Sequence, residues 1–267
     1  MKVTVVGSRG MAGHMLVNYL SSQGHTVTAV DRAQLDVESR NVDRFFDTLD
    51  ADFLVNAIGL LVQDCVDRPD RAITINSWWP QYCAYKLKDT NTQLIHLSTD
   101  CVFDGKQGNY IETDTHTETN SYGRSKSHGE VDNAKDVTFR MSIIGPELKN
   151  GTGLLNWVLT NPAQQIPGWD NAWWNGMTTL QLAKCIDQHI NNPVITGMYH
   201  LVSNRNQLNK YDLLCKINQA YGLGKTIVRT HGPKTINKVL VDTQEQVDFA
   251  IPDYDTMLEE LARSLKL

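Results

Sequence analysis

A doubly wound, parallel α/β sheet is the fold class that the sequence predicts, on three observations. Apolar runs alternate with helical stretches, a glycine-rich turn follows the first run, and an acidic residue closes the second. The runs lie at residues 2–6, 26–30, 53–56, 94–98 and 137–140, and the helical stretches at 12–22, 39–49, 71–88 and 122–134. Strands that alternate with helices in this way form a parallel sheet covered on both faces.

The first apolar run leads directly into Gly7-Ser8-Arg9-Gly10-Met11-Ala12-Gly13, and a helical pattern follows. Glycines let the backbone turn tightly beside a pyrophosphate, and the amides at a helix N-terminus favour its negative charge. The GxxGxxG spacing differs from the common GxGxxG fingerprint, and a glycine triplet alone is as typical of a plain turn. Asp31, roughly 20 residues further on, supplies the context, because a carboxylate there meets the adenosine ribose. We therefore predict a dinucleotide site that includes Gly7, Ser8, Arg9, Gly10, Met11, Gly13 and Asp31.

The residues around Asp31 give a mixed signal about the cofactor. Asp31 repels a 2′-phosphate and favours NAD(H), whereas Arg32 and Arg9 can pair with that phosphate and favour NADP(H), so NADPH has only a slight advantage. Asp36 and Val37 are expected beside the adenine, although Asp36 suits a helix N-cap equally well. At the end of the third strand, small residues leave room for the nicotinamide ribose: Ala57, Ile58 and Gly59.

Tyr122 and Lys126 form a second pattern, because residues four apart share one face of a helix. A cation beside a phenol lowers its pKa from about 10 and makes it a better acid toward a substrate oxygen. The strand at 94–98 delivers Thr99 to the carboxyl edge of the sheet, where its hydroxyl can hold the same oxygen; Ser98 is a weaker alternative. Tyr-x-x-x-Lys alone is more typical of a solvated helix face. With a dinucleotide site upstream, we predict Thr99, Tyr122 and Lys126 as catalytic residues.

The pattern changes after residue 145 into a loop-rich tract that carries four tryptophans, and the helix at 178–190 and the strand at 198–202 then return to the sheet. We predict a Rossmann-type dinucleotide-binding domain at 1–145 with 177–203. A smaller C-terminal α+β substrate-binding lobe is predicted at 146–176 with 204–267. A chain of 267 residues can bury one large core or two unequal lobes of this kind.

Composition excludes several other classes of protein. A net charge of −5 without basic runs argues against a nucleic-acid partner. The short apolar stretch before Gly7 is too brief for a signal peptide or membrane span, so we expect a cytoplasmic protein without a membrane partner. Five cysteines without a CxxC pair are expected to be buried thiols, and eight histidines without HExxH spacing predict no catalytic metal.

Three motifs together resemble a known family. The glycine turn, the block Ser98-Thr99-Asp100-Cys101-Val102-Phe103-Asp104-Gly105, and Tyr122-Gly123-Arg124-Ser125-Lys126 with Gly129-Glu130 are similar to the extended short-chain dehydrogenase/reductases, and within them to the dTDP-4-dehydrorhamnose reductases. The resemblance implies NAD(P)H-dependent reduction of the C4 carbonyl of a nucleotide-linked 4-keto-6-deoxysugar, in the supply of activated deoxysugars for cell-surface polysaccharide. Tyr122 would protonate the developing alkoxide, Lys126 would bind the nicotinamide ribose, and both would thus contact the cofactor.

The resemblance also implies substrate contacts and shows departures from the family. Expected contacts are Gln63, Asp64, Thr99, Asp100 and Trp173, although a solvated loop suits the first two and a structural turn suits Asp100 equally well. Cys101 stands where the family usually has tyrosine, and Ile143 stands near a usual tryptophan. Trp169, Trp173 or Trp174 could replace that stacking surface, although tryptophan is more often core. A related 4-keto sugar, including an N-acetylated one on UDP, therefore suits the same chemistry.

Two other functions fit these residues. A nucleotide-sugar epimerase of the same superfamily uses the same Tyr and Lys, whereas a 4,6-dehydratase is disfavoured because Cys101 rather than glutamate follows Asp100. Some members of the fold are NADP-binding regulatory subunits, as in the beta subunit of methionine adenosyltransferase, and fold alone cannot distinguish them from enzymes. The retention of Thr99, Tyr122 and Lys126 favours catalysis, and a homodimer is possible.

Overall fold

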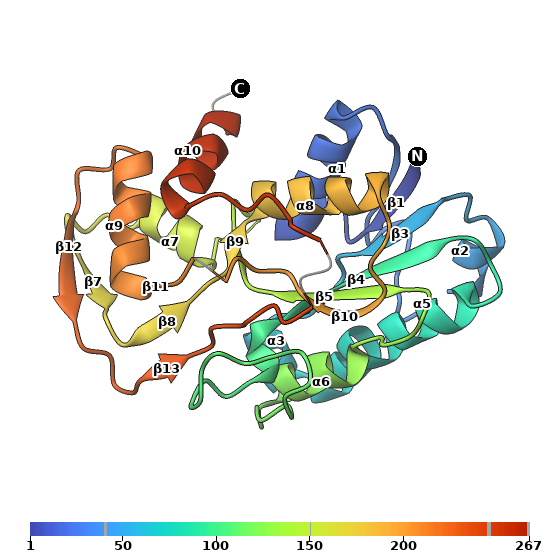
Figure 1. Ribbon diagram of the computed structural model, residues 1–267, viewed down its shortest axis with the longest axis horizontal. Coiled ribbons are helices and arrows are strands. Elements are labelled where there is room, and N and C mark those ends of the chain that lie inside the picture. The colour runs from blue at the N-terminus through green and yellow to red at the C-terminus, as the bar shows by residue number, and fades with distance from the viewer. Residues whose placement is uncertain (40–41, 150, 205, 245–246, 266–267) are drawn as a thin grey trace.

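The computed structural model describes residues 1–39, 42–149, 151–204, 206–244 and 247–265. Its centre is a six-stranded parallel sheet in the order β2-β1-β3-β4-β5-β10, which confirms the predicted fold class (Figure 1). The strands are β1 (Lys2–Val6), β2 (Thr26–Val30), β3 (Phe53–Asn56), β4 (Gln93–Thr99), β5 (Val137–Met141) and β10 (Gly197–His200). The chain adds β2 on one side of β1 and β3 on the other. Ligands bind at the carboxyl ends of strands where the strand order reverses in this way.

Alternation along β1 explains how the sheet is covered on both faces. Val3 and Val5 join a core cluster with α1 (Met11–Ser22) and α8 (Thr179–Asn191), whereas Val6 joins a second cluster with α5 (Trp79–Leu87). In Figure 1 these helices lie on opposite sides of the sheet, with α6 (Ser121–Gly129) next to α5. Each face therefore has its own apolar layer, as expected for a buried parallel sheet.

The helix predicted at 71–88 is three consecutive pieces. They are α4 (Pro69–Ala72), a π-helical segment (Ile73–Trp78) and α5, and α3 (Val62–Asp67) precedes them. Pro80 has no amide to donate and its ring clashes with the preceding turn, so a regular α-helix cannot run through it. A π-helical segment absorbs this irregularity.

Two other helices are shorter than predicted. The helix expected at 39–49 is α2 (Asp43–Asp47), and residues 40 and 41 lie outside the described part of the chain. The Thr48 hydroxyl contacts the carbonyls of Arg44 and Phe45, which competes with continued helix. The helix expected at 122–134 is α6, which ends at Gly129. A Cβ at Gly129 would lie 1.9 Å from the carbonyl oxygen of Asn76, so only glycine permits this contact.

The smaller lobe contains more regular structure than the loop-rich tract that we expected after residue 145. It pairs β7 (Gln165–Trp169) with β12 (Thr226–Thr230), and β8 (Ala172–Trp174) with both β11 (Leu208–Asn209) and β13 (Ile236–Asn237). At its border, β6 (Ile143–Ile144) and β9 (Met177–Thr178) of the predicted dinucleotide-binding domain pair with each other. Its helices are α7 (Leu154–Thr160), α9 (Lys210–Ala220) and α10 (Tyr254–Ser264). Leu155 and Leu214 belong to the same core cluster as Val5, so the two lobes share one apolar core. Substrate binding by this lobe stays a prediction.

All five cysteines are free, and three of them are buried: Cys65, Cys83 and Cys185. Cys101 and Cys215 are partly exposed, so the prediction of uniformly buried thiols is wrong for these two. In the described residues, no helix combines the length and apolar character that a membrane crossing needs.

Candidate active site

Close backbone contacts explain two glycines of the first strand-turn-helix unit, Gly7 in the turn after β1 and Gly13 in α1. Gly7 has a φ of 80°, and a Cβ there would lie 2.8 Å from the carbonyl carbon of Ala57. A Cβ at Gly13 would lie 2.1 Å from the carbonyl oxygen of Gly7. Gly10, the N-cap of α1, offers no side chain to cap the helix. The turn therefore leaves an uncapped helix N-terminus beside a cradle that any larger residue would fill, which suits a pyrophosphate.

A cavity of about 430 Å³ opens in front of this turn, and most of the predicted cofactor residues line it. Those that do are Gly7, Arg9, Gly10, Asp31, Arg32, Asp36, Val37, Ala57, Ile58 and Gly59. The other predicted cofactor residues, Ser8, Met11, Gly13, Tyr122 and Lys126, are not part of its lining. The amides of Gly7 and Ser8 both donate to the Val30 carbonyl, at 3.0 and 3.1 Å, so these two amides attach the turn to β2. Gly13 permits the close approach of α1 to the turn.

Three charged residues of the cavity were missed from the sequence: Glu38, Arg71 and Lys149. Arg71 forms two hydrogen bonds to Glu38, at 2.8 and 2.7 Å, and Arg32 approaches the same carboxylate at 3.2 Å. The Arg71 guanidinium holds the pKa of Glu38 below its usual value. No local pattern marks these residues, because they come from separate segments that only the fold brings together.

Asp31 is bound within its own turn at the end of β2. Its carboxylate accepts the backbone amide of Ala33 at 2.9 Å and lies 3.4 Å from the Arg9 guanidinium. The Ala33 amide is the main cause of a lowered pKa of Asp31, which keeps the carboxylate ionised. Asp36 accepts the amide of Glu38 at 3.1 Å in a turn, and the N-cap of α2 is Val42, so Asp36 is not the N-cap of that helix.

Thr99 and Tyr122 come together at the carboxyl edge of β4. Thr99 ends the strand and caps a 3-10 helix (Asp100–Val102), where its hydroxyl accepts the Cys101 amide at 3.1 Å. Tyr122 lies in the first turn of α6, whose N-cap Asn120 accepts the Gly123 amide at 2.8 Å. The Thr99 side chain is close enough to Tyr122 to stabilise its phenolate form. Two hydroxyls on separate elements can therefore meet one substrate oxygen.

Lys126 does not lower the pKa of Tyr122, contrary to our expectation. Burial raises the pKa of Tyr122, with Cys101 and Asp100 adding to it and the Thr99 side chain opposing it. The Lys126 ammonium instead donates to the Leu97 carbonyl at 2.7 Å, and burial lowers the Lys126 pKa to about 8. Helical spacing placed both residues on one face but did not predict that Lys126 would be buried and Tyr122 half-buried.

A buried ionic network lies behind β4 and explains the role of Ser98. The Ser98 hydroxyl donates to Glu130 at 2.5 Å, which argues against Ser98 as the alternative to Thr99. Glu130 also accepts two hydrogen bonds from Arg140, at 2.9 and 2.6 Å. Arg140 in turn contacts the ring nitrogens of His116 and His200, each at 2.7 Å. Because the guanidinium only donates, both nitrogens accept and both rings are neutral.

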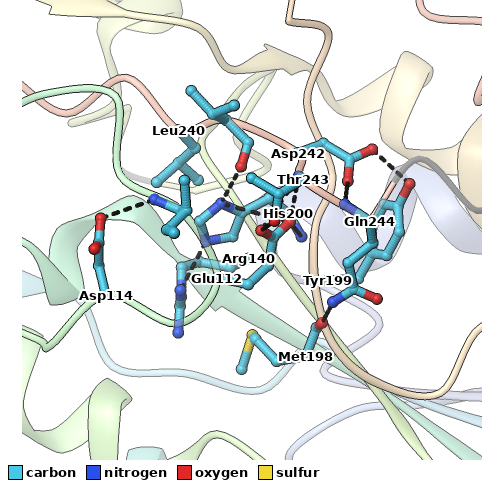
Figure 2. Close-up of polar contacts among 12 residues, drawn as sticks. Glu112, Asp114, Arg140, Met198, Tyr199, His200, Leu240, Asp242, Thr243 and Gln244 are labelled. Atoms are coloured by element: carbon cyan, nitrogen blue, oxygen red, sulfur yellow. Dashed lines mark hydrogen bonds and ion pairs between the residues drawn. The ribbon is translucent and has the colours of Figure 1, made fainter.

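Figure 2 shows how this network continues to the segment after β13. The second ring nitrogen of His200 donates to the Val241 carbonyl at 2.9 Å, and its backbone amide donates to Glu112 at 3.2 Å. The Thr243 hydroxyl donates to the same Glu112 carboxylate at 2.6 Å. Residues 240–244 are thereby attached to β10 and β5, so the position of β13 depends on the central sheet.

Two buried histidines predict that the folding stability decreases as the pH is lowered. Burial lowers the pKa of His200 and of His189 to about 4, against about 6.5 in the unfolded chain. The unfolded chain therefore binds protons that the folded chain does not, so this stability is complete above pH 6.5 and is lost toward pH 4. Each histidine contributes up to about 3 kcal/mol.

Urea unfolding between pH 7.5 and 4.5 measures this slope. We expect His189→Gln to make it shallower, and we expect the same change at the exposed His231 to leave it unchanged. Equal slopes in the wild type and His189→Gln would contradict the assignment.

The predicted substrate contacts divide into two groups. Asp100 is buried next to Thr99, and Trp173 is 38% exposed on β8. Gln63 and Asp64 lie on the exposed surface of α3, where Gln63 bonds to Asp67 at 2.8 Å. Substrate contact by all four stays a prediction.

The other two tryptophans of this region contact the protein itself. The Trp174 ring packs at 5.7 Å from Tyr254, and the Lys210 ammonium lies 4.8 Å above the Trp169 ring. Trp173 is thus the most exposed of the three candidates for a stacking surface. Among the described residues, no group of three or more His, Cys, Asp or Glu side chains could hold a metal ion.

The chain has relatives that are similar to it in sequence and in fold. Residues 1–237 match the profile of the family described as RmlD substrate binding domain. A spore coat polysaccharide biosynthesis protein, SpsK of Bacillus subtilis, is 28% identical over 85% of this chain and 82% of its own length. A dTDP-4-dehydrorhamnose reductase of Mycolicibacterium smegmatis is 31% identical over 48% of this chain and 40% of its own length.

Two further comparisons concern a relative that is not named as a reductase and a solved structure of similar fold. The beta subunit of mouse methionine adenosyltransferase 2 is 24% identical over 85% of this chain and 74% of its own length. A crystal structure of the Bacillus anthracis dTDP-4-dehydrorhamnose reductase in complex with NADP superposes with a TM-score of 0.85, at 18% identity over 98% of this chain and 99% of that one. With the glycine turn, the cavity and the Thr99–Tyr122 pair in place, this chain belongs to the RmlD substrate-binding domain family, the dTDP-4-dehydrorhamnose reductases of the extended short-chain dehydrogenase/reductases.

Proposed function

We propose that this protein reduces the C4 carbonyl of a nucleotide-linked 4-keto-6-deoxysugar at the expense of NADPH. The observation that carries the proposal is the meeting of Thr99 and Tyr122 at the sheet edge that also bears the glycine cradle. The names of SpsK and of the reductase relatives support a role in supplying activated sugars for polysaccharide. The nicotinamide would supply the hydride when bound.

The proton in this reaction comes from the protein. As C4 receives the hydride, its oxygen becomes an alkoxide, and the Tyr122 hydroxyl gives that oxygen its proton. Burial favours the neutral phenol, so Tyr122 holds its proton until a strongly basic oxygen forms beside it. Thr99 orients the same oxygen by a hydrogen bond. Lys126, with a pKa of about 8, would bind the nicotinamide ribose and can exchange protons near neutral pH to restore the phenol.

Turnover with a panel of substrates tests the proposal. NADPH and NADH oxidation would be followed against dTDP-, UDP-, GDP- and CDP-linked 4-keto sugars. We expect stoichiometric oxidation of NADPH with at least one of them. Interconversion of sugars without net oxidation would identify an epimerase. Binding of NADPH without turnover of any sugar would identify a regulatory subunit, the alternative that the methionine adenosyltransferase relative keeps open.

The position of the Arg32 guanidinium predicts that the protein prefers NADPH to NADH. Its guanidinium is mostly exposed at the rim of the cavity, with Arg9 and Arg71 nearby, so it can turn from Glu38 to a 2′-phosphate. We expect Arg32→Ala to raise KM for NADPH about tenfold, the loss of one charge-assisted hydrogen bond, and to leave KM for NADH nearly unchanged. Arg263→Ala, which removes an exposed arginine of α10, is the control. An equal effect on both cofactors would rule out recognition of the phosphate.

A further inference from the structure

Lys238 extends from the smaller lobe to the residues around the proposed proton donor. It directly follows β13, and its ammonium lies 3.5 Å from the Glu118 carboxylate, with both side chains 16% exposed. The same ammonium is close enough to Cys101 and Asp100 to favour the ionised form of each. Lys238 therefore joins three residues of the other lobe that lie within a few positions of Thr99 or Tyr122.

The backbone of Lys238 is fixed on both sides. The Asn237 amide donates to the Gly105 carbonyl at 2.7 Å, and the Lys238 amide donates to the Trp173 carbonyl at 3.4 Å. A Cβ at Gly105 would lie 3.1 Å from the Lys238 side chain. Immediately after it, the Val239 carbonyl accepts the Tyr110 amide at 2.9 Å. The Lys238 ammonium is therefore carried by a segment whose backbone is fixed by hydrogen bonds to its neighbours.

Glu118 transmits the contact to the helix that carries Tyr122. Its carboxylate accepts the amides of Thr119 and Asn120, at 2.9 and 3.3 Å, directly before α6. Its side chain also packs on Gly123, where a Cβ would lie 2.3 Å from the Glu118 Cγ. The start of α6 is therefore held by the Glu118 carboxylate, whose negative charge the Lys238 ammonium offsets.

Asp100 gives the electrostatic part of the argument. It is buried, and its negative charge disfavours ionisation of Tyr122, as do Cys101 and Cys65 from the neighbouring elements. A cation beside Asp100 offsets part of that charge at close range. Removing the cation would leave Asp100 and Glu118 uncompensated next to the proton donor.

From these contacts we infer that Lys238 is a positioning residue of the active site: its ammonium, supplied by the smaller lobe, compensates Asp100 and holds Glu118, so that Tyr122 can act as the proton donor. The inference rests on the proposed function for its kinetic consequence only. The contact itself can be tested without any turnover.

Kinetics of Lys238→Met and Lys238→Arg form the first test. We expect Lys238→Met to lower kcat for reduction about tenfold without changing KM for NADPH, because a less acidic phenol donates its proton more slowly. In the reverse oxidation, which needs the phenolate, the half-maximal pH should move upward. Lys238→Arg should restore both properties. Lys106→Met, which removes an exposed lysine paired with Asp104, is the matched control and should behave as wild type.

The Cys101 thiol provides the second test. Burial raises its pKa to about 12, and Lys238 opposes this rise, so the thiolate fraction reports on the cation directly. Alkylation by iodoacetamide between pH 7 and 10, followed by mass spectrometry of the Cys101 peptide, should be several-fold slower in Lys238→Met and near wild type in Lys238→Arg. Cys215, also partly exposed, is the internal reference.

The two tests separate the possible failures. A wild-type protein that turns over no sugar, but whose Cys101 responds to Lys238→Met, would refute the reductase function and leave the placement of Lys238 intact. Unchanged Cys101 alkylation in a folded Lys238→Met protein would overturn the inference. A fall in kcat with no shift of the oxidation pH profile would also overturn it, because a purely structural contact gives that result.

Discussion

Tyr122→Phe is expected to lower kcat by a factor of about 10²–10⁴ while leaving NADPH affinity nearly unchanged. Phenylalanine keeps the ring that packs at the start of α6 and removes only the hydroxyl. Without that hydroxyl the developing alkoxide has no positioned proton, and Thr99 alone can only orient the oxygen. Single-turnover oxidation of NADPH and a separate fluorescence titration of NADPH binding measure the two quantities.

The matched control is Tyr85→Phe, which removes a hydroxyl from an exposed tyrosine of α5. It should retain wild-type kcat. Wild-type turnover by Tyr122→Phe would show that another group donates the proton. A large loss of NADPH affinity would instead assign Tyr122 mainly to the cofactor.

Local spacing in the sequence predicts the parts of this site that short segments build. The glycine turn, the end of β4 and the first turn of α6 each occupy a few consecutive residues, and a parallel sheet brings their carboxyl-side loops to one edge. Thr99 and Tyr122 therefore meet as expected. Spacing does not report burial, which is why the pKa of Tyr122 is raised by its surroundings instead of lowered by Lys126.

Long-range contacts account for what the sequence did not predict. Arg71 and Lys149 reach the cofactor cavity from segments with no motif, and Lys238 reaches Asp100 from more than a hundred residues away. The positions of Lys149 and Lys238 depend on how the smaller lobe packs against the sheet, and that of Arg71 depends on the packing of α4. Pro80 does predict an interruption of the helix at 71–88, because a proline inside a helical pattern breaks the regular helix.

Arg140→Met should destabilise the fold by about 3–5 kcal/mol, because it removes one partner of a buried ion pair and leaves the other charged. The Arg140 and Glu130 side chains are 1% and 5% exposed. Methionine fills a similar apolar volume but supplies no donor to Glu130, His116 or His200, and it loses the contact of the guanidinium with the Phe103 ring at 5.1 Å. Urea unfolding at pH 7.5 measures the change.

Arg263→Met is the matched control, since Arg263 and Glu259 form an exposed pair, with side chains 74% and 51% exposed, that should contribute no more than about 1 kcal/mol. Adding Glu130→Gln to Arg140→Met should recover part of the loss, because the stranded charge is then removed. A cost below about 1 kcal/mol for Arg140→Met would mean that water reaches Glu130 when Arg140 is absent. Glu130 also accepts a hydrogen bond from the hydroxyl of Ser98, next to Thr99. A loss of about 3–5 kcal/mol in the free energy of unfolding would therefore indicate that the Arg140–Glu130 network supports the end of β4.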